Sequence, residues 1–201
     1  GGAFLDLGGA CSCGHGGLNA DGSLDASFHP GLDETSASSV FALAVQPDGE
    51  ILVGGFLCLA GEENVRFITR LNGNGTVDPS FGAVAQDMVY TLALQPDGAI
   101  IVGGRFGELN GQPRALIGRL NADGSTDGTF NPGAEGHGVY CLAQQPDGGI
   151  VVGGSFTSLG GKPRLNIGRL ANESADAAAL PDGCVAWWKG EDDFHDAVGT
   201  N

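Results

Sequence analysis

Positively charged side chains are scarce in this chain. Its 201 residues include nine Lys and Arg against 24 Asp and Glu, which gives a formal net charge of −15 at pH 7. Proteins that bind nucleic acid or anionic membrane surfaces need clustered Lys and Arg to meet the phosphates. We therefore expect neither kind of partner. The acidity is interpreted as a source of solubility, with cation binding on an acidic surface as the alternative.

Long apolar runs and paired cysteine motifs are also lacking. Without 18 consecutive apolar residues, the sequence predicts no membrane span, and no signal peptide is visible. The number of cysteines, five, is odd, so at least one is unpaired or pairs outside the chain. A disulfide between Cys11 and Cys13 would be strained, and no two Cys-x-x-Cys motifs suggest zinc. Cysteine usage therefore indicates no particular compartment.

The familiar signatures of catalysis are missing as well. The sequence contains no Gly-x-Ser-x-Gly nucleophile turn and no Gly-x-x-x-x-Gly-Lys-Ser/Thr phosphate loop. Its four histidines show no metal-ligand spacing. The sequence consequently assigns no catalytic, cofactor-binding or metal-ligating residue. The histidines are His15, His29, His137 and His195.

One tetrapeptide, Gln-Pro-Asp-Gly, occurs three times, at Gln46–Gly49, Gln95–Gly98 and Gln145–Gly148. The copies start 49 and 50 residues apart, and each is flanked by an apolar run, a second apolar run ending in Gly-Gly, and a later Arg-Leu. This is an internal repeat, and a repeat of this length predicts the architecture before any single residue does.

The copy that begins at Val89 is typical of strands joined by tight turns. Its Pro-Asp-Gly predicts a hairpin turn, because Pro presets one turn angle and Gly adopts a positive φ. The following Ile100-Ile101-Val102 is apolar without alternation, which favours burial on both faces. Gly103 and Gly104 mark a bulge or a close backbone approach. The strands expected in this copy are 89–94, 100–102, 115–120 and a shorter one at 126–130.

Four short strands in about 50 residues, without helical periodicity, are typical of a propeller blade. The fold class we predict is all-β: a partial β-propeller of about three and a half four-stranded blades, with no significant helix. A closed propeller has at least about four blades, so we expect further copies upstream of Gly1 or self-association of the chain. The predicted blades are 1–31 (partial), 40–82, 89–133 and 139–176.

The repeated text resembles a known family. The pattern Leu-Ala-x-Gln-Pro-Asp-Gly-x-Ile-x-Val-Gly-Gly, followed by Arg-Leu-Asn-x-Asp-Gly-Ser-x-Asp-x-x-Phe, is similar to the bacterial delta-60 repeat, a β-propeller-like repeat of large secreted or surface proteins. The resemblance covers nearly all of residues 1–176. It implies an extracellular or cell-surface location, and it carries over no catalytic residue.

The tail resembles a different family. After a linker expected at 177–182, the segment Val185-x-Trp187-Trp188-x-x-Glu191 looks like the opening strand of a laminin-G-like, concanavalin-type jelly-roll domain, which 183–201 would only begin. That resemblance implies glycan or protein binding, sometimes with calcium, through loops beyond Asn201. One or both tryptophans would then belong to the core of the jelly roll, the alternative being stacking on a sugar.

Recurrent polar residues suggest two further hypotheses. Asn121-x-Asp123-x-Ser125-x-Asp127 alternates oxygen ligands as calcium loops do, and a similar run begins at Asn19. Gly124 stands at the fourth position, which a hairpin turn explains better than an EF-hand loop does. No cofactor is therefore predicted, with calcium as the alternative. An ion pair within each blade is the second hypothesis, joining Arg70 to Asp78, Arg119 to Asp127 and Arg169 to Asp176.

These observations favour a non-catalytic scaffold or binding module, possible roles being adhesion and the binding of carbohydrate or protein. Its variable loops, such as 61–64 and 108–112, would be presented from a rigid frame. The alternative is the propeller portion of a secreted polysaccharide-active enzyme whose catalytic part lies elsewhere. Cys141, which stands where the other copies have Ala42 and Thr91, is expected to be a small buried residue.

Overall fold

The computed structural model describes residues 6–7, 10–11, 17–33 and 38–171. Within these ranges the chain is all-β and contains no helix, so none there could cross a membrane. A pair of two-residue strands, β1 (Asp6–Leu7) and β2 (Ala10–Cys11), comes first. The linker at 177–182 and the jelly-roll start at 183–201 lie outside the described residues.

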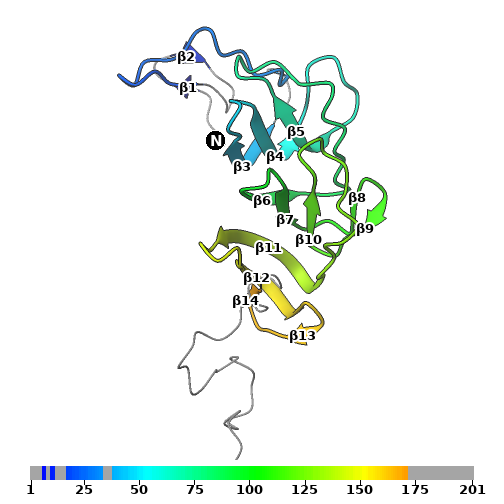
Figure 1. Ribbon diagram of the computed structural model, residues 1–201. Coiled ribbons are helices and arrows are strands. Elements are labelled where there is room, and N and C mark those ends of the chain that lie inside the picture. Colours follow the sequence, from blue (N-terminus) through cyan, green and yellow to red (C-terminus); the bar gives the residue numbers. More distant parts are fainter. Residues whose placement is uncertain (1–5, 8–9, 12–16, 34–37, 172–201) are drawn as a thin grey trace, which may run out of the picture.

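Three antiparallel sheets follow, one for each Gln-Pro-Asp-Gly copy, and Figure 1 shows them stacked one above the other. In each sheet the middle strand pairs with the strand before it and the strand after it. The first sheet has β3 (Ser39–Val45), β4 (Ile51–Leu57) and β5 (Arg66–Leu71). The second has β6 (Val89–Leu94), β7 (Ile100–Gly104) and β10 (Ile117–Leu120). The third has β11 (Ala134–Gln144), β12 (Ile150–Leu159) and β14 (Ile167–Leu170).

Short hairpins extend two of the sheet units. β8 (Glu108–Leu109) pairs with β9 (Gln112–Pro113) where the sequence predicted a loop. In the third sheet β13 (Lys162–Pro163) pairs with the far end of β12. These hairpins lie between the second and third strands of their units, so the predicted strand order is unaffected.

The Gln-Pro-Asp-Gly segments are hairpin turns, as predicted. Gly49, Gly98 and Gly148 have φ values of 91°, 86° and 84°, which Gly adopts without the clash that a Cβ brings. In the first copy the Gly49 amide donates to the Gln46 carbonyl and the Glu50 amide donates to the Asp48 carboxylate. The repeated Asp is thus used by the turn itself.

The predicted fourth strand was wrong in its extent. Instead of a strand at 126–130, the second unit has a single bridge between Leu120 and Thr126. The chain then turns at once, because the Asp127 carboxylate accepts the Thr129 amide at 2.7 Å. A side chain that satisfies the backbone locally competes with a strand ladder.

Two apolar cores lie between successive sheets. The core between the first and second sheets includes Leu52, Ile68, Val89 and Val102. The next core joins Ile101 and Ile117 of the second sheet to Val139, Val152 and other residues of the third. Both faces of β7 are therefore buried, which confirms the expectation from its unalternated apolar sequence.

The Gly-Gly pairs permit this stacking. A Cβ on Gly103 would lie 2.6 Å from Cγ1 of Val139 in the third sheet, and a Cβ on Gly54 would lie 2.6 Å from Cγ1 of Val89 in the second. The second glycine of each pair faces its own sheet instead, where a Cβ on Gly104 would lie 2.1 Å from the Met88 carbonyl oxygen. The missing side chain of the first glycine therefore lets neighbouring sheets pack closely, and the missing side chain of the second leaves room for a bulge.

Candidate functional site: an aromatic row

An aromatic residue occupies the same place in each sheet, at a β-bulge in its first strand. The register shifts between Val40 and Ala42 in β3, between Val89 and Thr91 in β6, and between Val139 and Cys141 in β11. Such a bulge re-aims the side chain of the extra residue. The extra residues here are Phe41, Tyr90 and Tyr140, which we call the aromatic row.

The three rings are in contact across the stack. Ring centroids are 5.6 Å apart for Phe41 and Tyr90 and 5.4 Å apart for Tyr90 and Tyr140, with tilted to edge-on geometry. Phe41 and Tyr140 are each 50% exposed, and Tyr90 between them is half-buried. Because each ring is fixed by strand backbone and by its neighbour, the row is a preorganised apolar surface that water can reach.

An ion pair borders the row. Arg105 follows β7, and its Nε lies 3.1 Å from a carboxylate oxygen of Asp87. Partial burial raises the pKa of Asp87, but the hydrogen bond and charge of Arg105 and the Met88 amide outweigh it and lower the pKa below its ordinary value. The Asp87 carboxylate raises the pKa of Arg105, and the nearby Tyr90 and Tyr140 raise it further. Rings, phenol hydroxyls, a guanidinium and a carboxylate thus stand together.

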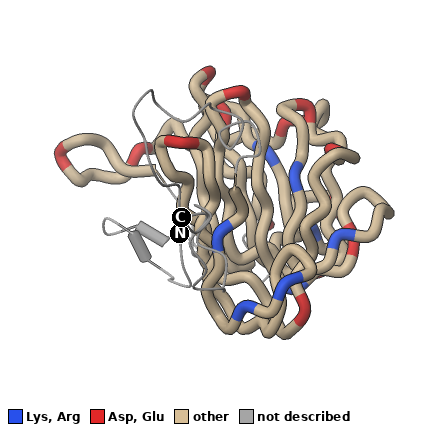
Figure 2. The backbone as a smooth tube through the Cα atoms, turned by 60° about the horizontal axis from the view of Figure 1, so that its bottom comes forward, with Lys and Arg blue, Asp and Glu red and all other residues tan. Residues whose placement is uncertain are grey.

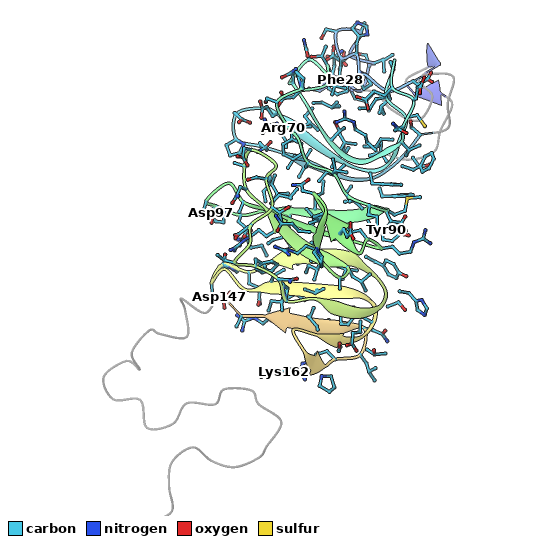
Figure 3. The ribbon with its side chains drawn as sticks, turned by 90° about the vertical axis from the view of Figure 1, so that its right-hand side faces the viewer. Phe28, Arg70, Tyr90, Asp97, Asp147 and Lys162 are labelled. Carbon is cyan, nitrogen blue, oxygen red and sulfur yellow. The ribbon has the colours of Figure 1, made fainter. Side chains whose placement is uncertain are left out.

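A shallow groove lies between two hairpin turns, lined on one side by Pro96 and Asp97 and on the other by Pro146 and Asp147. Figure 3 places Asp97 and Asp147 at the edge opposite Tyr90. The groove is open and is formed by turn residues. Its two carboxylates already accept backbone amides of their own turns, Asp97 from Ala99 and Asp147 from Gly149.

The recurrent arginines anchor the turns. Arg70 donates to Asp78 at 2.8 Å and to the Ala122 carbonyl of the next unit at 2.9 Å, and its guanidinium lies 4.8 Å from the centre of the Phe81 ring. Arg119 repeats the ion pair and the ring contact: it donates to Asp127 at 2.7 Å, and its guanidinium lies 4.9 Å from the centre of the Phe130 ring.

The ion pair predicted within each blade is therefore confirmed in two units. Arg169 in the third sheet instead contacts Gln145 and Asp147, and its predicted partner Asp176 lies outside the described residues.

The run considered for calcium forms side-chain hydrogen bonds within the turn. The Asp123 carboxylate accepts the amide and the hydroxyl of Ser125 at 2.9 and 2.6 Å, and Asn121 donates to that hydroxyl at 2.8 Å. Gly124 has a φ of 88°, as the hairpin interpretation requires. Among the residues that the structure describes, no group of three or more His, Cys, Asp or Glu could hold a metal ion.

Cys141 was expected to be buried, and this was wrong. Its side chain is exposed, because it lies on the outer face of the third sheet. The corresponding Ala42 and Thr91 lie on faces against which the next sheet packs, and both are half-buried. The small residue suits a covered position, but no further sheet among the described residues covers this one.

Sequence reasoning assigned no binding residue and missed the aromatic row. The signal was present, because Val-Phe, Val-Tyr and Val-Tyr stand at the same place in the three copies. The signal is easily overlooked, because an aromatic residue within an apolar strand usually belongs to the core. Only the bulge turns these rings out of the core.

A search of family models matches three segments of the chain, at residues 46–81, 95–130 and 145–174, each to a domain of unknown function (DUF5122) beta-propeller. The matched segments begin at the three Gln-Pro-Asp-Gly turns and together span half of the chain. A search of curated proteins found no match.

Proposed function

The chain belongs to the DUF5122 β-propeller family, and we propose that it is a non-catalytic binding module whose ligand is a saccharide held at the aromatic row. Each of the three sheets is then a blade of a partial propeller, with a fourth, partial one at 1–31. The delta-60 name, the jelly-roll start at 183–201 and a location outside the cell or at its surface belong to the same proposal. Fractionation of the native host tests the location.

The observation that carries the proposal is the half-exposed contact of Phe41, Tyr90 and Tyr140 beside the Arg105–Asp87 pair. Apolar faces of sugar rings stack on aromatic side chains, and sugar hydroxyls need donors and acceptors nearby. Both requirements are met within one surface. A glycan need not meet a positive surface, which agrees with the acidic composition; Figure 2 shows Asp and Glu mostly on peripheral loops and turns.

Screening of the chain on a glycan array, followed by calorimetric titration of each hit, tests the proposal. Tyr90→Ala is expected to weaken binding of a hit by about tenfold or more, whereas Tyr90→Phe retains the stacking surface and most of the affinity. Asp97→Asn is the matched control, because Asp97 lies at the opposite edge and Asn keeps the turn acceptor (Figure 3).

Three outcomes would contradict the saccharide assignment. The array could show no binding, Tyr90→Ala could bind as the unchanged chain does, or Asp97→Asn could weaken binding as much as Tyr90→Ala. The proposed ligand would then be a protein instead of a saccharide, bound by loops such as 61–64 and 108–112.

A further inference from the structure

The aromatic row is longer than a single sugar. Its three rings come from three successive sheets, one from each, so the row crosses the strands and follows the direction in which the sheets stack (Figure 1). The centroids of neighbouring rings are 5.6 and 5.4 Å apart. That separation is close to the length of one sugar unit in an extended oligosaccharide, so consecutive units of a sugar chain fall on consecutive rings.

The planes of the three rings are not parallel. The rings of Phe41 and Tyr90 are inclined to each other by 55°, and those of Tyr90 and Tyr140 by 68°. A flat, rigid ligand therefore meets the face of only one ring at a time. An oligosaccharide rotates about each of its linkages, so each unit can turn an apolar face toward a differently tilted ring. The row thus fits a chain of sugars better than a flat, rigid surface.

The ion pair distinguishes the middle of the row from its ends. Arg105 follows the Gly-Gly pair of the second unit, whereas the uncharged Phe56 and Ser155 take this place in the first and third units. The Asp87 carboxylate accepts from Nε and Nη2 of Arg105, and Nη1 has no partner among the described residues. A sugar unit over Tyr90 is therefore within reach of a charged donor, which forms stronger hydrogen bonds than a neutral one.

We propose that the ligand is an oligosaccharide chain bound lengthwise along the aromatic row, with three consecutive units on Phe41, Tyr90 and Tyr140. This inference rests on the proposed function, since it requires that the row binds a saccharide. Tyr90 and the ion pair hold the middle unit, and the ring at each end of the row holds one unit more. Affinity therefore depends on chain length, because each added unit makes a further stacking contact until the row is filled.

Calorimetric titration with a length series tests the inference, using chains of one to five units of a saccharide that binds on the array. Affinity is expected to rise about three- to tenfold with each unit up to the third and then to level off, because one stacking contact contributes about that much. Equal affinity for chains of one and three units, or a rise that continues to five, would overturn the inference and leave the proposed function standing. No binding at any length would overturn both.

Removal of both ends of the row is the decisive arm. The double variant Phe41→Ala/Tyr140→Ala keeps Tyr90 and the ion pair, so the affinity for one unit is retained and longer chains gain nothing over it. Phe41→Leu/Tyr140→Leu keeps apolar side chains packed against Tyr90 while it removes the aromatic faces, and it is expected to give the same result. Thermal unfolding of both double variants establishes that they are folded.

Val45→Ala is the matched control. Like Phe41, Val45 is an exposed apolar side chain of β3, but it lies at the far end of that strand, next to the Gln46–Gly49 turn. This variant is expected to show the same rise of affinity with chain length as the unchanged chain. A rise that persists in both double variants, or one that Val45→Ala abolishes as fully as they do, would overturn the lengthwise placement.

Discussion

At the scale of single residues, one arginine makes several contacts at once. Arg70 is 9% exposed, and it pairs with Asp78, reaches the Ala122 carbonyl of the next unit and lies over Phe81. The sequence predicted the ion pair from recurrence alone. It could not predict the link to Ala122, because that contact depends on how two sheets stack.

Replacing Arg70 by Met is expected to lower the free energy of unfolding by about 3 kcal/mol, because Asp78 stays behind as a poorly hydrated carboxylate. Arg66→Met is the matched control: its pair with Glu62 is partly exposed, and its loss should cost less than about 0.5 kcal/mol. Urea unfolding measures both. Equal effects would mean that the Arg70 pair does not stabilise the fold more than a surface pair.

The same carboxylates make stability depend on pH. Hydrogen bonds from Ser80 and the charge of Arg70 lower the pKa of Asp78, and Thr129 and Arg119 do the same for Asp127. In the unfolded chain both groups return to about 3.9. Their contribution is therefore complete above that pH and is lost as the pH falls through the lower folded values.

We expect the urea midpoint to fall on acidification from about pH 5 to about pH 3, and to fall less in the double variant Asp78→Asn/Asp127→Asn. Urea titrations across this range measure both effects. An identical fall in the variant would show that other groups carry the pH dependence.

At the scale of elements, the repeated strands and turns could be predicted and the fourth strand could not. Continuous apolar runs and Pro-Asp-Gly are local signals, and β6, β7 and their turn lie where these signals are. The prediction of a fourth strand failed because the Asp127 carboxylate accepts the hydrogen bond of the Thr129 amide within a turn. The aromatic row escaped prediction because a bulge cannot be read from an apolar run.

The sheet-to-sheet fit depends on the first glycine of each pair. Gly103→Ala is expected to destabilise the fold by about 1–3 kcal/mol, because the new methyl group would overlap Val139 and Thr91. Gly82→Ala is the control, since a Cβ there meets nothing within 4 Å and its φ is not in the left-handed region. Thermal unfolding of both variants provides the comparison; a Gly103→Ala chain as stable as Gly82→Ala would refute the packing account.

The Asn-x-Asp-Gly-Ser turns are expected to be indifferent to calcium. Because Asp123 and Asn121 are already hydrogen-bonded to Ser125, excess calcium and excess EDTA should give the same melting temperature. A calcium-dependent rise that Asp123→Ala abolishes would instead establish a metal site in the turn.

At the scale of the whole molecule, three equivalent sheets stack so that equivalent residues come into line. The stack turns one aromatic position into a row and buries the second sheet on both of its faces. Neither property belongs to a single repeat. Sequence analysis predicted units of this kind, but it could not show which side chains the stacking would align.

The most direct test of the binding account uses the fact that the chain has only two tyrosines, Tyr90 and Tyr140, both in the aromatic row. With tyrosine rings selectively labelled, NMR of the chain gives one set of ring signals for each. Titration with a saccharide that binds on the array is predicted to shift both sets along one saturable curve, with the dissociation constant found by calorimetry. Binding of that saccharide with both tyrosine signals unmoved would contradict the account.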